Sequence, residues 1–61
     1  MIELHSIDNG QSIWLNPMHI VKFEAYDGVT FITCSKGDIY KVTESLPHIL
    51  EAMTELRKMH L

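Results

Sequence analysis

The sequence predicts an α+β fold, in which a small antiparallel sheet or meander of about five short strands precedes one C-terminal amphipathic helix. Turn-forming pairs recur at short intervals through the first part of the chain, and the segments between them are rich in β-branched and aromatic residues. After Val42, apolar residues instead recur at three- and four-residue steps. A chain of 61 residues has room for one core, so residues 1–61 are expected to form a single domain.

Four breaks separate the expected strands. Asn9-Gly10 and Asp27-Gly28 are pairs typical of two-residue hairpin turns. Asn16-Pro17 is a third break, because proline pushes the preceding residue out of the helical region. The fourth is a turn at Ser35–Asp38. The short connections favour neighbouring antiparallel strands. The expected strands are about Ile2–Ile7, Ser12–Leu15, His19–Tyr26, Val29–Cys34 and Ile39–Val42.

The C-terminal segment has the pattern of an amphipathic helix, expected from about Glu44 to Met59. Thr43 or Ser45 is the expected N-cap, and Pro47 is compatible only with the first turn. The expected apolar stripe consists of Leu46, Ile49, Leu50, Met53 and Leu56.

The apolar residues exceed what one helix can cover. Hydrophobic residues make up 46% of the chain, and several expected strands carry them on both faces. Either the sheet curls into a small barrel, or a second subunit covers the face opposite the helix. We expect the second arrangement, or a mixture of the two, and therefore a homo-oligomer. The candidate interface residues, for a second subunit or another partner, are Trp14, Tyr26 and Ile32.

Few side chains could carry chemistry. Cys34 lies in an expected strand, where nothing lowers the pKa of a thiol, and is read as a buried, inert residue. The four histidines lack the spacing of a metal site, and no paired cysteines support them. We assign no catalytic, cofactor-binding or metal-binding residue and expect that the chain is not an enzyme.

The charge balance disfavours nucleic-acid binding. Five Lys and Arg residues stand against eight Asp and Glu residues, and Lys36 and Lys41 form only a weak candidate basic patch. The start of the chain lacks the basic and apolar regions of a signal peptide. No apolar run approaches the ~18 residues that span a bilayer. We therefore expect a cytoplasmic protein without membrane insertion.

Short motifs recur along the whole chain: Met1-Ile2-x-Leu4, Asn9-Gly10, Leu15-Asn16-Pro17, Ile20-x-x-Phe23-Glu24-Ala25, Val29-Thr30-x-Ile32-Thr33 and Gly37-x-x-Tyr40-x-Val42-x-Glu44-Ser45. Together these motifs resemble the FlbD family of small proteins encoded among bacterial flagellar genes. This resemblance implies a non-enzymatic accessory or protein-interaction module linked to flagellar motility, and it brings no catalytic residues or cofactors.

A second resemblance gives the alternative function. The segment from His19 to Met53 is similar to the middle of a LytTR DNA-binding domain, with strands, tight turns and a helix in the same order. It implies a small transcriptional regulator. The net charge of −3 argues against this alternative.

Overall fold

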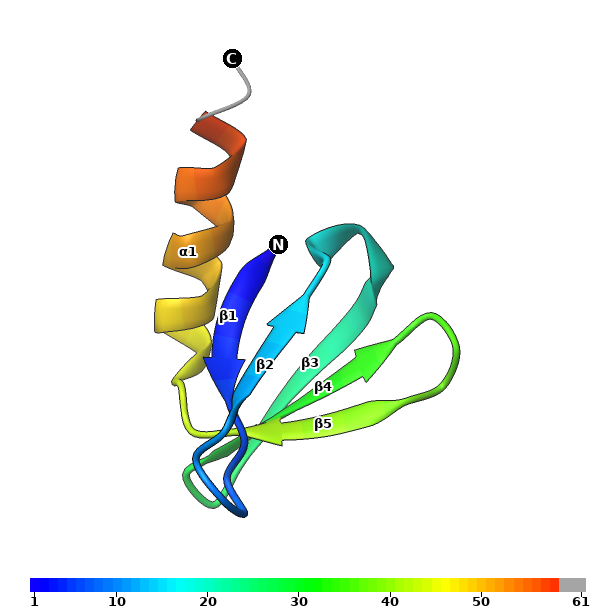
Figure 1. Ribbon diagram of the computed structural model, residues 1–61, viewed down its shortest axis with the longest axis vertical. Helices are drawn as coiled ribbons and strands as arrows, with labels where there is room; N and C mark the ends of the chain where they lie inside the picture. Colours follow the sequence, from blue (N-terminus) through cyan, green and yellow to red (C-terminus); the bar gives the residue numbers. More distant parts are fainter. Residues whose placement is uncertain (59–61) are drawn as a thin grey trace.

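The computed structural model describes residues 1–58 and confirms the predicted α+β fold (Figure 1). Turns at the expected Gly and Pro positions separate five short strands, and one helix follows them. In chain order the elements are β1 (Ile2–His5), β2 (Ser12–Leu15), the 3-10 turn η1 (Pro17–His19), β3 (Ile20–Tyr26), β4 (Val29–Cys34), β5 (Ile39–Val42) and the helix α1 (Leu46–Lys58).

The strands form two antiparallel sheets, so they are not a single continuous meander. β1 pairs with β2, and β3, β4 and β5 form the second sheet in that order. β2 does not pair with β3, because η1 turns the chain between them: Pro17 starts the turn, and the Asn16 side chain accepts a hydrogen bond from the Met18 amide at 3.0 Å. The expected strand start at His19 therefore moves to Ile20.

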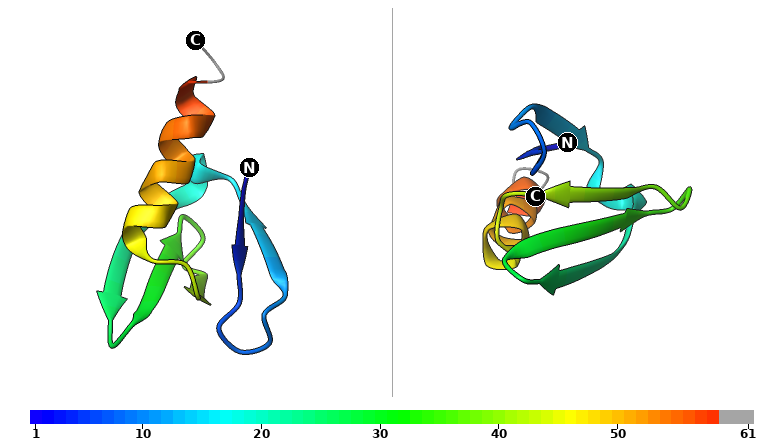
Figure 2. Two further views of the ribbon diagram at one scale, coloured as in Figure 1. Left: turned by 90° about the vertical axis from the view of Figure 1, so that its left-hand side faces the viewer. Right: turned by 90° about the horizontal axis from the view of Figure 1, so that it is seen from below.

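The two sheets meet where β1 passes the end of β5. Ser6 forms an isolated bridge with Val42. The Thr43 amide donates to the His5 carbonyl at 2.9 Å, and the Ile7 amide donates to the Lys41 carbonyl at 3.0 Å. β1 itself ends at His5, although Ile7 was the expected end. The N-terminal hairpin thus lies beside the end of the second sheet (Figure 2).

The helix α1 begins two residues later than expected. Of the two candidate caps, Ser45 takes the role: its hydroxyl accepts a hydrogen bond from the His48 amide at 3.3 Å, and its carbonyl accepts one from the Ile49 amide at 3.0 Å. Ile49 is the buried residue of the helix, whereas Leu50, expected in the same stripe, is 47% exposed. The expected end at Met59 lies outside the described residues.

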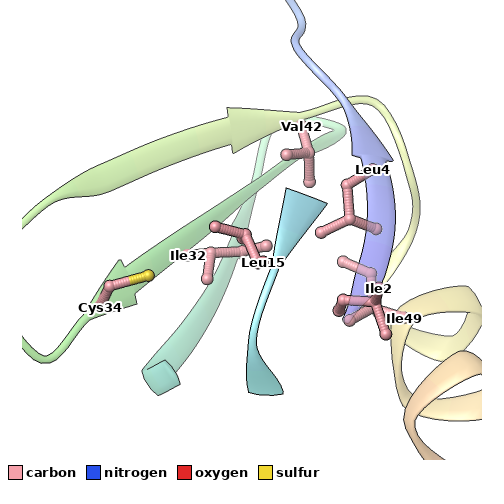
Figure 3. Close-up of a cluster of buried hydrophobic side chains, with 7 residues drawn as sticks. All are labelled: Ile2, Leu4, Leu15, Ile32, Cys34, Val42 and Ile49. Atoms are coloured by element: carbon pink, nitrogen blue, oxygen red, sulfur yellow. The ribbon is translucent and has the colours of Figure 1, made fainter. Parts of the chain in front are cut away.

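The core lies between the N-terminal hairpin, the second sheet and the helix (Figure 3). Ile32 belongs to this core and is fully buried within the chain itself, which corrects its assignment to an exposed interface. The N-terminal hairpin covers the inner face of β4, because η1 and the Ser6–Val42 bridge carry β1 and β2 across it. The hairpin and α1 therefore cover the same face of the second sheet, and the expected homo-oligomer stays a prediction. The buried apolar residues are Ile2, Leu4, Leu15, Ile32, Cys34, Val42 and Ile49.

Candidate protein-interaction surfaces

The three expected interface residues do not share one surface. Trp14 is exposed on β2, opposite Glu3 of β1. Tyr26 is exposed at the end of β3, in the other sheet, beside the Asp27-Gly28 turn. Ile32 lies in the core. Any partner that contacts both Trp14 and Tyr26 must therefore span two sheets.

An apolar groove lies between the C-terminal half of α1 and the turn η1. We call it the methionine groove; its volume is about 390 Å³. Met18 is 88% exposed and Met1 is 67% exposed, so large apolar side chains are presented to solvent at its margin. The residues that line it are Met1, Asn16, Pro17, Met18, Met53, Leu56 and Arg57.

Local structure explains how these side chains come to line the groove. The hydrogen bond from the Met18 amide to Asn16 fixes η1 and leaves the Met18 side chain outside the core. Met53 and Leu56 are three residues apart on α1, so they share one face of the helix, and both are half-buried. Arg57 supplies the positively charged side chain among the lining residues. The result is an apolar hollow whose lining includes the guanidinium of Arg57.

Trp14 lies next to this groove. A second hollow, of about 300 Å³, has Trp14 in its lining and shares Met1 and Asn16 with the methionine groove. Sequence reasoning identified Trp14 but missed the methionines, which come from three distant segments. One signal was present, because Met18 directly follows a proline in an expected break, where a large apolar side chain has no strand or helix to pack it.

The outward side of β3, β4 and β5 is a second exposed surface, which we call the outer sheet face. The strand register places Glu24, Phe31 and Lys41 in one row across it, and Lys22, Thr33 and Ile39 in the next. The Lys22 ammonium lies 3.1 Å from the Glu24 carboxylate, and the Lys41 ammonium lies 5.9 Å from the centre of the Phe31 ring. Tyr26 extends the same face.

The two lysines of the candidate basic patch lie in different surroundings. Lys36 is in the turn between β4 and β5 and lines the hollow beside Trp14. Lys41 lies over Phe31 on the outer sheet face. The structure therefore does not gather them into one hollow.

His5 and Glu44 form a polar contact that joins the two sheets. His5 Nδ1 lies 2.6 Å from Glu44 Oε2, and the His5 amide donates to Glu44 Oε1 at 2.9 Å. The hydrogen bond to Glu44 raises the pKa of His5 above its ordinary value. Partial burial opposes ionisation of Glu44, but the hydrogen bonds from His5 outweigh it and lower the pKa of Glu44. This contact holds the N-terminal hairpin against the β5–α1 connection.

The buried thiol of Cys34 and the buried hydroxyl of Thr30 both lie inside the fold. Burial raises the pKa of the Cys34 thiol, which keeps it protonated. Within residues 1–58, no group of three or more His, Cys, Asp and Glu side chains is placed to hold a metal ion. The Thr30 hydroxyl, which is buried, donates to the Glu44 carbonyl at 2.8 Å. No helix in the described part of the chain is both long and apolar enough to cross a membrane.

Comparison with known proteins gives one family. The model of the FlbD family, described as flagellar and swarming motility proteins, matches residues 1–60. No curated protein and no solved structure matches the chain.

Proposed function

Because the chain belongs to the FlbD family of flagellar and swarming motility proteins, we propose that it is a non-enzymatic accessory protein of the bacterial cytoplasm that acts by binding another protein. The observation that carries this proposal is the methionine groove. Its lining is mainly apolar, and Met1 and Met18 expose most of their surface beside it. Exposed apolar groups arranged around a hollow are typical of a protein-binding site.

The composition of the groove supports a partner segment with apolar side chains. Methionine side chains are unbranched and flexible, so they adapt to the shape of an apolar partner. Met53 and Leu56 form a wall on one side and Pro17 and Met18 on the other, which suits an amphipathic segment laid between them. Arg57 at this site favours a partner that also carries a carboxylate.

The polar groups of the chain support a binding role without catalysis. Within residues 1–58, every buried side-chain nitrogen or oxygen has a hydrogen-bond partner, as is usual for polar groups that serve the fold. The most strongly paired ionisable groups, His5 and Glu44, bond to each other at the junction of the two sheets. Their hydrogen bonds serve the fold.

Motility complementation with two matched variants tests the proposal. Met18→Glu places a charge at the margin of the groove, whereas Leu50→Glu places the same charge at an exposed position of α1 that does not line it. In a bacterial strain that lacks the gene, Met18→Glu is expected to lose swimming or swarming, and Leu50→Glu is expected to restore it. Circular dichroism verifies that both variants fold.

Two outcomes would contradict the proposal. Full motility with a folded Met18→Glu chain would show that the groove does not bind a required partner. Equal loss of motility in both folded variants would show that the effect is not specific to the groove. A crosslinker at position 18, with position 50 as the control, then identifies the bound motility protein in complementing cells.

A further inference from the structure

We propose that the chain forms a homodimer in which β3 pairs antiparallel with the β3 of a second copy, centred on Phe23. This goes beyond the proposed function, because it concerns a different surface from the methionine groove. It rests on three features of β3, which are an unpaired edge, a self-complementary charge pattern and the conformation of the turn that follows.

The edge of β3 is open in the described part of the chain. β3 pairs only with β4, and the sheet order places it at the margin. Figure 2 shows β3 at the outside of the sheet when the molecule is seen from below. β3 is also the longest strand, with seven residues from Ile20 to Tyr26. An exposed edge of this length offers a row of backbone donors and acceptors to another strand.

The hairpin turn determines which backbone groups point outward. Asp27 and Gly28 both have positive φ, 52° and 78°, which is the type I′ conformation. In this hairpin the flanking residues Tyr26 and Val29 form the hydrogen-bonded pair, and the bonding then alternates along the strand. The amide and carbonyl groups of Glu24 therefore face β4, whereas those of Phe23 and Ala25 face the open edge.

The charges on β3 select one register. Lys22 and Glu24 both lie on the outer sheet face, on either side of Phe23. Antiparallel pairing centred on Phe23 places each Lys22 opposite the Glu24 of the second copy, and opposite charges at such positions are favourable. Centring on Ala25, the other residue whose backbone groups face the open edge, instead places Glu24 opposite Tyr26 and brings no opposite charges together. A second copy of this chain thus pairs with the open edge of β3 and forms two symmetric Lys22–Glu24 charge pairs.

The ends of the paired segment are also defined. The register shift between Ile20 and Lys22 makes a bulge at Val21, which ends regular pairing on that side. Val21, which is 65% exposed, lies at this end of the paired segment. The other margin of the sheet, β5, meets β1 at Val42. A two-fold pairing through β3 therefore gives a closed dimer.

Charge reversal tests the interface in the full-length chain. Analytical ultracentrifugation at low salt should give twice the 7.0 kDa mass of one chain for the natural sequence. Lys22→Glu or Glu24→Lys alone should weaken the dimer on the order of tenfold, because each change converts two attractive pairs into repulsive ones. The double variant Lys22→Glu/Glu24→Lys should dimerise like the natural chain, since the pattern is again self-complementary.

A mixing experiment and a control complete the test. The two single variants, mixed in equal amounts, should form a mixed dimer, because one presents two acidic and the other two basic side chains. Lys41→Glu makes the same charge change on the outer sheet face two strands away, and it should leave the dimer intact. A monomer at all concentrations would overturn the proposal. A dimer that is insensitive to both single charge reversals would overturn it too, because the interface would lie elsewhere.

Discussion

Ile49 is the buried side chain through which α1 enters the core, and a pair of alanine substitutions tests how much it contributes to holding the helix on the sheets. Ile49 is 0% exposed, whereas its neighbour Leu50 is 47% exposed. Both substitutions remove a similar apolar group from consecutive positions of the same helix. Only Ile49→Ala removes it from the core, among Ile2, Leu4 and the other buried residues (Figure 3).

The expected cost of Ile49→Ala is about 2–5 kcal/mol, because the buried contacts are lost and a cavity remains. Alanine is the better helix former, which offsets a few tenths of a kcal/mol. Leu50→Ala should cost less than about 1 kcal/mol, since much of that side chain is already in water. At about 0.05–0.15 kcal/mol per residue, the whole chain of 61 residues has roughly 3–9 kcal/mol of stability. Ile49→Ala therefore removes a large share of it.

Urea denaturation followed by far-ultraviolet circular dichroism measures the difference. With an m-value of about 1 kcal/mol/M, the midpoint for Ile49→Ala should fall by about 2 M or more, or the chain should be unfolded without urea. The midpoint for Leu50→Ala should fall by less than about 1 M. Equal losses for the two variants, at matched protein concentration, would refute the view that the buried Ile49 stabilises the fold more than the exposed Leu50.

Two further predictions concern the His5–Glu44 contact and the Asp27-Gly28 turn. The raised pKa of His5 gives stability that is present below pH 6.5 and is lost as the pH rises through the folded pKa of His5. The lowered pKa of Glu44 gives stability that is present above pH 4.5 and is lost as the pH falls through the folded pKa of Glu44. The stability difference between the natural chain and Glu44→Gln should therefore be greatest between pH 4.5 and 6.5, and a difference independent of pH in denaturation titrations would contradict this. Gly28→Ala should cost about 1–2 kcal/mol, because Gly28 has a φ of 78°, whereas Asp27→Asn should be nearly neutral in the same thermal unfolding assay.

The sequence predicted elements better than their arrangement. Gly and Pro in the turns bounded the strands to within two residues, because those residues have strong local preferences. Alternation along β4 correctly grouped Ile32 with Cys34, but it could not tell which side faces the core. That depended on the bridge between Ser6 and Val42, a contact between distant segments that leaves no local pattern.

The candidate surfaces were predictable to a similar degree. Alternation placed Trp14 and Tyr26 opposite the apolar side of their strands, and both are exposed in the single chain, while their role as interface residues stays a prediction. The methionine groove was missed because Met1, Met18 and Met53 meet only when η1 and α1 are side by side. Met53 fitted the apolar stripe of the helix equally well as an ordinary core residue.

The contact between His5 and Glu44 also has a consequence for how the chain folds during synthesis. The two residues are 39 positions apart. The bridge from Ser6 to Val42 and the hydrogen bond from Ile7 to Lys41 likewise join the start of the chain to its last third. At about 5–20 residues per second, a ribosome takes about 2–8 s to extend the chain from His5 to Glu44. During that interval β1 and β2 can pair with each other, but their inner face stays uncovered. Folding is therefore completed only after the C-terminal third has been made, and until then the uncovered apolar side of the hairpin is open to chaperones and to aggregation.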